Sequence, residues 1–315
     1  FAMIWKEANK RFDEYGNDKV IGTNGFYAMK AHWSEHPDRD EAWADTERSR
    51  IGEERFRREH ECEFLIFDET LISSLTLADM EGVPPVETTG QVRWFKRPTP
   101  GMTYLVSLDP SMGTGGDYAA IQIFELPTFE QIGEWHHNMT PMNKQVQILQ
   151  GINKHIHDTI IERDSSASPQ IFYSMENNTI GEAALMRVMD IGEENIMGMF
   201  LSEPIRKGHR RKFRRGFNTT AKHKIDACTK FKELVEGGKM KINSQLLISE
   251  MKDFVATGLS YKAKPGQHDD LVSSCLLMTR MMKVLADFDP KIFEKWTDRT
   301  SELTTPMPIF GNFYG

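Results

Sequence analysis

Residues 103–126, TYLVSLDPSMGTGGDYAAIQIFEL, constrain the fold more than any other stretch of the chain. An apolar run rich in β-branched residues ends at Asp109, a glycine-rich turn follows, and a second run of β type comes after it. This pattern predicts a β-hairpin with Asp109 at the end of its first strand. An unpaired buried carboxylate is costly, so Asp109 must face solvent, a cation or a hydrogen-bond donor, and we expect a metal ion.

The chain beyond this hairpin alternates between strand and helix patterns. A third strand is predicted over 131–137, a buried strand over 171–177 and another strand over 239–242. Helices are predicted over 221–235 and 244–255. A strongly apolar helix is predicted from Asp270 to about residue 285. Three antiparallel strands followed by alternating helices and strands predict an α/β fold, a mixed sheet with helices on its faces.

Acidic side chains occupy comparable positions in this predicted sheet. Asp109 closes one strand and Glu176 closes another, while Asp269 and Asp270 open the last helix. Strand ends on one side of a mixed sheet, with a helix start beside them, would bring these carboxylates to one point. Carboxylates at one point repel each other unless cations neutralise them, and an all-oxygen ligand set favours Mg²⁺ or Mn²⁺ over Zn²⁺. The sequence therefore predicts a divalent-metal site.

Each carboxylate also has a simpler interpretation. Asp109 could be a turn residue, and Glu176 could pair with Arg or Lys at a sheet edge. Asp269 or Asp270 could cap the helix, although capping and metal binding are compatible because one of the two can do each. Asp117 is a candidate auxiliary ligand or an ordinary turn residue.

The net charge of −7 conceals an uneven distribution. Residues 1–100 carry 14 Lys and Arg against 20 Asp and Glu, whereas residues 201–245 carry 13 against 4. The segment RKGHRRKFRR, residues 206–215, is typical of a polyanion site that binds backbone phosphates without reading sequence. A solvated basic loop, or a surface that pairs with the acidic first hundred residues, is the alternative. The predicted DNA contacts are Arg206, Lys207, Arg210, Arg211, Lys212, Arg214 and Arg215.

Several motifs resemble those of one protein family. LDPSMGTGGDYAA, SMENN and HDDLVSS, in this order, resemble the nuclease motifs of the large terminase subunit of tailed bacteriophages, especially the contractile-tailed kind. ERFRREHECEFL, before them, resembles the segment that closes the ATPase domain of the same proteins. The residues that carry this second likeness are Phe56, Glu59, Cys62 and Phe64. The resemblance implies a ribonuclease H-like fold that cuts concatemeric double-stranded DNA at the start and end of genome packaging.

The resemblance also implies roles for the acidic residues. The family's triad falls on Asp109, Glu176 and one of Asp269 and Asp270, of which we favour Asp270 because it is closest to the helix. With two metal ions about 4 Å apart, Asp109 would bridge both, Glu176 would hold one and Asp270 the other. No protein nucleophile is then required. His268 could approach the scissile phosphate.

The expected domains follow from the same resemblance. Residues 1–82 would be the C-terminal portion of an ATPase domain and 83–101 a linker. Residues 102–290 would be the ribonuclease H-like nuclease domain and 291–315 a C-terminal tail. The Walker A pattern G-x-x-x-x-G-K-[ST] is absent, and GTGGD at 113–117 has no following Lys, so we expect no ATP hydrolysis from this chain and no cofactor besides the metal.

The expected partners are double-stranded DNA, the portal protein, the small terminase subunit and the ATPase domain of the full-length chain. The expected place of action is the host cell cytoplasm. The apolar stretches are too short to span a bilayer and no signal peptide is visible, so we expect no membrane partner.

Three other functions fit parts of the sequence. LDPSMGTGGD resembles the phosphate loop of actin-like and sugar-kinase ATPases, but SMENN and HDDLV do not supply the further glycine motifs of those enzymes. A Holliday-junction resolvase shares the fold and the acidic site, and would prefer a four-way junction to a duplex. A non-catalytic DNA-docking or portal-docking module with a degenerate site would not cleave DNA with Mn²⁺.

Overall fold

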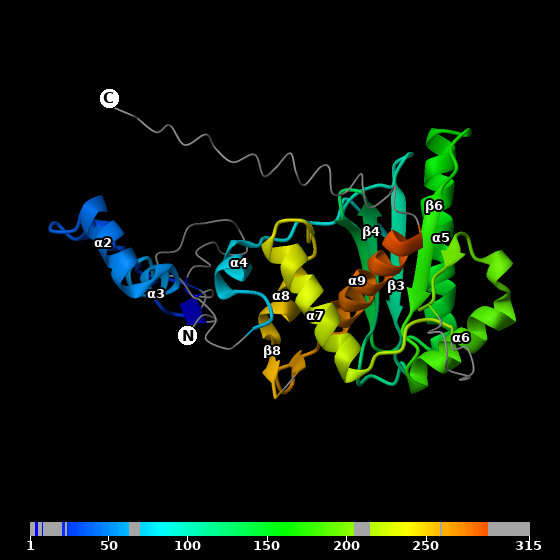
Figure 1. Ribbon diagram of the computed structural model, residues 1–315. Helices are drawn as coiled ribbons and strands as arrows, with labels where there is room; N and C mark the ends of the chain where they lie inside the picture. The colour runs from blue at the N-terminus through cyan, green and yellow to red at the C-terminus, as the bar shows by residue number, and fades with distance from the viewer. Residues whose placement is uncertain are drawn as a thin grey trace, which may run out of the picture. The chain divides into compact units, whose positions relative to one another are not determined.

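The chain forms two compact units in the computed structural model, Phe1–Phe67 and Asp68–Gly315 (Figure 1). The structure describes residues 4, 5, 8, 21, 22, 24–62, 70–204, 215–258 and 260–288. The predicted tail, 291–315, lies outside the described residues. None of the helices within the described ranges combines the length and apolar character that crossing a membrane demands.

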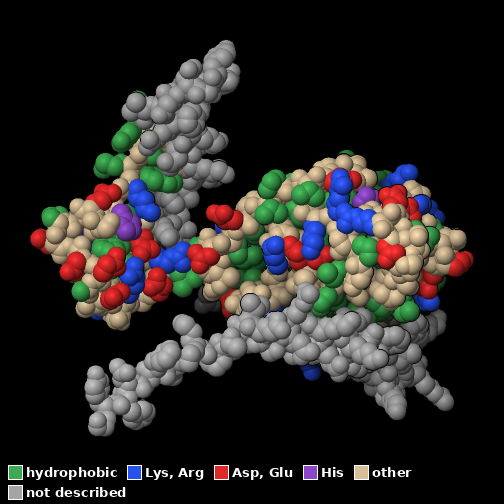
Figure 2. Space-filling model, turned by 90° about the horizontal axis from the view of Figure 1, so that it is seen from above, with side chains coloured by type: hydrophobic (Ala, Val, Ile, Leu, Met, Phe, Trp, Pro, Cys, Tyr) green, Lys and Arg blue, Asp and Glu red, His purple; other side chains and the backbone are tan. Residues whose placement is uncertain are grey.

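The first unit is helical over most of the part that the structure describes. Its elements are η1 (Trp33–Glu35), α2 (Glu41–Ile51) and α3 (Glu53–His60). Asp40 caps α2 by accepting a hydrogen bond from the Trp43 backbone N at 2.8 Å, and Gly52 divides α2 from α3 with a φ of +83°. A small core contains Trp33, Ala44 and Phe56. On the surface, carboxylates and basic side chains alternate (Figure 2), with ion pairs such as Arg50–Glu47.

The second unit is built on a seven-stranded sheet in the order β1-β2-β5-β4-β3-β6-β7. The strands are β1 (Glu87–Thr89), β2 (Val92–Trp94), β3 (Thr103–Asp109), β4 (Ala119–Leu126), β5 (Glu130–His137), β6 (Gln170–Met175) and β7 (Met199–Phe200). β3 pairs antiparallel with β4, with Asp109 opposite Ala120, which confirms the predicted hairpin. β3 and β6 are parallel neighbours, as are β6 and β7. The sheet is therefore mixed, and β1 and β2 come from within 83–101.

Helices cover both faces of this sheet, as predicted (Figure 1). The helices of this unit are α4 (Ser74–Asp79), α5 (Met142–Arg163), α6 (Thr179–Ile191), η2 (Glu193–Asn195), α7 (Ala221–Glu236), α8 (Gln245–Asp253) and α9 (Asp270–Phe288). α5 and α6 pack into one core with Tyr104, Val106 and Leu108 of β3. α9 lies against the other face, where the Ser107 and Ser274 hydroxyls are 2.8 Å apart.

Alternation along β3 sets the direction of Asp109. Successive residues of a strand point to opposite faces of the sheet. Val106 and Leu108 belong to the core with α5 and α6, and Ser107 contacts α9. Asp109 continues the Ser107 side and therefore emerges on the face that α9 covers, where the strand ends.

Two local features differ from the sequence-based expectation. A second sheet, the hairpin of β8 (Phe254–Thr257) and β9 (Ser260–Ala263), was not predicted. The strand expected at 239–242 makes only an isolated bridge, between Lys241 and Glu130. Met240 and Ile242 are nonetheless buried, so their apolar character reflects packing rather than strand pairing.

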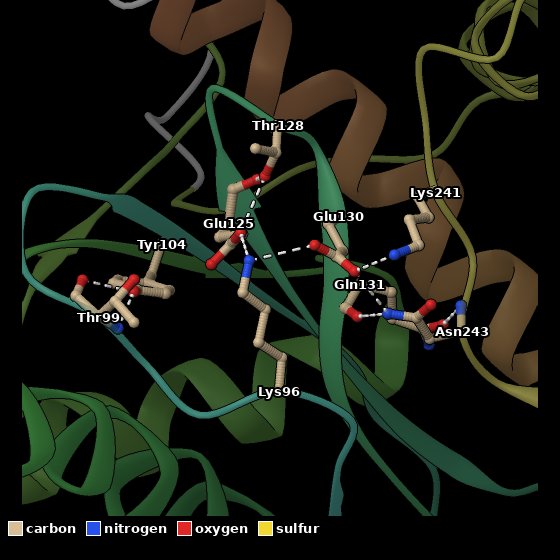
Figure 3. Close-up of polar contacts among 9 residues, drawn as sticks. All are labelled: Lys96, Thr99, Tyr104, Glu125, Thr128, Glu130, Gln131, Lys241 and Asn243. Atoms are coloured by element: carbon tan, nitrogen blue, oxygen red, sulfur yellow. Dashed lines mark hydrogen bonds and ion pairs between the residues drawn. The ribbon is translucent and has the colours of Figure 1, made fainter. Parts of the chain in front are cut away.

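A polar cluster closes the end of β4 farthest from Asp109 (Figure 3). Lys96 contacts the carboxylates of Glu125 and Glu130, and its Nζ is 3.2 Å from Glu130 Oε2. Lys241 Nζ donates to Glu130 Oε1 at 2.6 Å, and Asn243 Nδ2 to the same atom at 3.2 Å. Burial by itself would raise the pKa of Glu130, but hydrogen bonds from Lys241, Asn243 and Lys96 bring it below its usual value.

Candidate active site

Asp109 and Glu176 lie side by side at the carboxyl ends of two parallel strands. β3 and β6 are paired in register up to Leu108 and Met175, and the Glu176 backbone N donates to the Leu108 carbonyl at 3.2 Å. Asp109 and Glu176 are the next residues of the two strands. Main-chain pairing thus brings together two carboxylates that are 67 positions apart in the sequence.

The start of α9 supplies the remaining acidic residues. Asp269 Oδ2 accepts a hydrogen bond from the Ala263 backbone N at 3.3 Å and lies 4.0 Å from Lys224 Nζ. Asp270 is the first residue of α9, and its side chain is 15% exposed. The carboxylate of Asp269 is thus tied to neighbouring groups of its own, whereas that of Asp270 is the more buried of the two.

The electrostatics show that these carboxylates share one site. Burial first, and then the charges of Glu176 and Asp270, raise the pKa of Asp109 well above its usual value. A hydrogen-bonding interaction with Glu176 acts in the same direction, and Asp269 adds a smaller effect. Burial and the charge of Asp269 raise the pKa of Asp270 to about 6. The charges of Glu176, Asp269 and Asp270 thus act on Asp109, as expected of carboxylates that lie in one region of the molecule.

A cavity of about 150 Å³ opens beside this acidic group. Asp109 and Glu176 form part of its lining, and other polar and basic side chains of the lining come from α7, α9 and the residues before α7. These lining residues are Thr219, His223, Lys224 and Arg280. A cavity lined by both acidic and basic residues suits a phosphodiester that contacts a metal ion and cationic side chains.

The ligand chemistry fits a hard divalent cation. The candidate ligands Asp109, Glu176 and Asp270 offer only carboxylate oxygens, the donors that Mg²⁺ and Mn²⁺ prefer. Within the described ranges, no three His, Cys, Asp or Glu side chains are close enough together to hold one ion between them. Shared coordination by this group would therefore require side chains to turn inward.

Two further predicted residues lie on the Asp270 side. Asp117, in the turn between β3 and β4, is exposed, and its charge contributes to the raised pKa of Asp270. His268 Nδ1 is 3.6 Å from Asp270 Oδ2, and its ring contacts Tyr118 edge-on at 4.8 Å. Both residues are thus neighbours of Asp270.

The described residues that flank the basic segment lie next to Glu176. Asn177 Nδ2 donates to the Arg215 carbonyl at 2.7 Å, and the Glu203 backbone N donates to the Gly216 carbonyl at 3.2 Å. The Arg215 guanidinium pairs with Glu193. The other predicted DNA contacts, Arg206, Lys207, Arg210, Arg211, Lys212 and Arg214, lie outside the described residues.

Sequence reasoning missed several residues of this region. Arg280 donates to the Thr219 hydroxyl at 3.0 Å and to the Asn218 carbonyl at 3.0 Å, and it also pairs with Glu203. His223 Nδ1 lies 2.8 Å from the Asn218 carbonyl, so that nitrogen carries the proton. These residues belong to no short motif. The one available signal was Arg280, the first charged side chain in α9 after the nine uncharged residues 271–279.

Comparison with known proteins places this arrangement in context. The profile of the family described as "Terminase RNaseH-like domain" matches residues 106–281, more than half of the chain. The large terminase nuclease of thermophilic phage G20c, solved with bound magnesium and with bound cobalt, has a similar fold in both structures. The match to each of these two structures has a TM-score of 0.50 and a sequence identity of 17%. It covers 68% of this chain and 97% of the phage G20c chain. The human cytomegalovirus terminase nuclease domain, soaked with Mn and inhibitor-bound, is 13% identical with a TM-score of 0.42, and covers 67% and 93%.

Proposed function

The chain belongs to the terminase RNaseH-like domain family, and on that premise we propose that it is a metal-dependent endonuclease that cuts double-stranded viral DNA during genome packaging. The observation that carries the proposal is the group formed by Asp109, Glu176 and Asp270, which come from two strand ends and a helix start. Burial, followed by the charges of Glu176 and Asp270, raises the pKa of Asp109, and burial with the charge of Asp269 raises the pKa of Asp270. Such uncompensated acidity is typical of a site that binds a divalent cation.

The ligand assignment follows from the positions of these carboxylates. Asp109 is central, since the charges of both Glu176 and Asp270 act on it, and it is the candidate to bridge two Mg²⁺ or Mn²⁺ ions. Glu176 and Asp270 would each complete one ion's ligand set, with Asp117 and Asp269 as auxiliary candidates. The bound ions would supply an activated water and would stabilise the leaving 3′ oxygen.

The protein's own residues would hold the DNA against this site. Lys224 and Arg280, which line the same cavity as Asp109 and Glu176, carry the positive charge that a phosphodiester requires. Arg215, the described residue of the basic segment 206–215, lies against Asn177, and the segment would bind neighbouring phosphates without sequence preference. The substrate is therefore duplex DNA bound through its backbone.

The remaining assignments complete the proposal. Residues 1–82 would be the end of an ATPase domain, and the first compact unit makes up most of that range. Partners would be the portal protein and the small terminase subunit, and the place of action would be the cytoplasm of the infected host cell. We assign no ATPase activity to residues 1–315, which contain no Walker A pattern.

Plasmid digestion tests the proposal. With Mg²⁺ or Mn²⁺, the wild-type chain should nick and linearise supercoiled plasmid, and neither Asp109→Ala nor Glu176→Ala should do so. Glu125→Gln, at a buried carboxylate of the far end of β4, is the matched control and should cleave like the wild type. Cleavage by Asp109→Ala at the wild-type rate would refute the proposal, and a wild type that binds DNA without cleaving it would favour the docking alternative.

The basic segment is tested separately. Charge reversal at Arg210, Arg211 and Arg214 should weaken duplex binding and reduce its dependence on salt, while Mn²⁺ binding is retained. Unchanged affinity at low and high salt would remove this segment from the DNA-binding surface.

A further inference from the structure

α9 is capped differently from its neighbours. The residue before α6, α7 or α8 caps that helix with its own side chain, through Asn178, Thr220 and Ser244 respectively. At the start of α9, Asp269 instead uses its carboxylate to accept from the Ala263 backbone N. The backbone N–H groups of the first turn of α9 are therefore served by a residue from elsewhere.

That residue is Glu250, near the end of α8. Glu250 Oε2 accepts from the Leu271 backbone N at 2.8 Å and from the Val272 backbone N at 3.1 Å. These are the second and third residues of α9, the positions that an N-cap side chain normally serves. One carboxyl oxygen from another helix thus replaces the local cap.

The Glu250 side chain is fixed in turn by its surroundings. It is only 11% exposed, and its Oε1 lies 3.7 Å from His136 Nε2. The His136 ring stacks on Tyr118, with centroids 4.1 Å apart and an angle of 16° between the planes. The Tyr118 backbone also interacts with the carboxyl group of Asp270 and lowers its pKa. Contacts from β5, the β3–β4 turn and α8 therefore converge on the start of α9.

We propose that Glu250 is a positioning residue for the metal site: it caps α9 from outside and so holds Asp270, the first residue of that helix, in place to bind the metal. The proposal rests on the proposed function, because Glu250 can act as a positioning residue only if Asp270 binds a metal ion. Residues that orient metal ligands typically contribute about 10- to 100-fold in metal affinity or activity. Glu250 contacts no reacting group itself and acts through the backbone of residues 271 and 272.

Two variants separate this role from a merely structural one. Glu250→Ala removes the acceptor, whereas Glu250→Gln keeps a side-chain oxygen that can accept from the same two backbone N–H groups. The control is Glu125→Ala, which removes a fully buried carboxyl at the end of β4 that is farthest from Asp109. Melting temperatures of all variants establish that each is folded under the assay conditions.

The measurements are direct Mn²⁺ binding by titration calorimetry and the Mn²⁺ concentration that gives half-maximal plasmid cleavage. Glu250→Ala should weaken Mn²⁺ binding and raise that concentration by about 10-fold or more, with much of the cleavage rate recovered at saturating Mn²⁺. Glu250→Gln should remain within a few-fold of the wild type. Glu125→Ala should lower the melting temperature without changing the Mn²⁺ requirement.

Three results would overturn the positioning role. The first is that Glu250→Ala binds Mn²⁺ as tightly as the wild type. The second is that Glu250→Gln is as defective as Glu250→Ala. The third is that Glu125→Ala raises the Mn²⁺ concentration needed for cleavage as much as Glu250→Ala does. If Glu250→Ala does not fold, the Gln variant and a Glu250→Asp variant, whose side chain is too short to span the same gap, decide the question. A wild type that binds Mn²⁺ and cuts no DNA would instead refute the proposed function.

Discussion

Carboxylates lie at both ends of the β3–β4 hairpin: Asp109 at the near end, beside the turn, and Glu125 at the far end. The pKa shifts of the carboxylates at the two ends have opposite directions. At the far end, Lys96 and Lys241 neutralise Glu125 and Glu130, and the pKa of Glu130 is lowered (Figure 3). At the near end, burial and the charges of neighbouring carboxylates raise the pKa values of Asp109 and Asp270. The far end illustrates how a fold stabilises a buried charge. At the near end, the buried and clustered carboxylates lower the stability of the fold. Carboxylates that destabilise a fold in this way are more often retained for binding or catalysis.

The largest expected effect comes from removing the central negative charge at the near end. Asp109→Asn should reduce Mn²⁺-dependent cleavage by about 10³-fold or more, the scale seen when a central catalytic group is removed. The same variant should melt at a higher temperature than the wild type in metal-free buffer, because repulsion is relieved. Glu130→Gln should do the opposite at the far end and lower the melting temperature with activity retained. Lower metal-free stability in Asp109→Asn would contradict the comparison.

The second-largest effect is expected from removing a cation at the far end of the hairpin. Lys96→Met keeps much of the side-chain length but leaves Glu125, which is 0% exposed, without its cation. We expect a loss of about 2–3 kcal/mol in the free energy of unfolding, below the range for a fully buried pair because Lys96 is 36% exposed. Urea denaturation measures the loss, and cleavage per folded molecule should not change. A double variant, Lys96→Met with Glu125→Leu, should recover part of the stability.

The smallest effect is a difference in pH dependence. The pKa of Asp270 is about 6 in the folded chain, against an ordinary value of 3.8, so the folded state holds more protons between these values. The free energy of unfolding of the metal-free protein should therefore fall as pH rises from about 4 to about 6, by on the order of 1–2 kcal/mol from this group. Glu130 contributes with the opposite sign, since its lowered pKa gives stability that is lost as the pH falls. Urea titrations of wild type and Asp270→Asn between pH 4.5 and 7 isolate the Asp270 contribution, and parallel curves would contradict it.

Much of the fold follows from local patterns. The 103–126 hairpin was predictable because alternating apolar residues and a glycine turn are both encoded within a few positions. The helix at 221–235 was also predicted nearly to its observed end at Glu236. The β8–β9 hairpin was missed because its strands have four residues each, too few to establish a period, and Phe254 and Val255 continued the helical pattern of α8.

The residues of the candidate site, too, were predictable only where a local sequence pattern marks them. Asp109 and Glu176 were identifiable because strand ends can be read from the sequence, and the sheet then brings two strand ends together. Glu250 was not identifiable, because its partners are backbone N–H groups of a helix that begins 20 positions later. No residue type or spacing marks that contact. Tertiary packing alone determines it.

The parallel pairing of β3 with β6 has a further consequence for how such a chain can vary. The relative position of Asp109 and Glu176 is determined by a ladder of main-chain hydrogen bonds and not by the length of chain between them. Residues added to the loops around α5 would leave the two carboxylates next to each other. A single residue inserted inside either strand would send one of them to the opposite face of the sheet. Natural variation in length should therefore concentrate in the connections and spare the two strands.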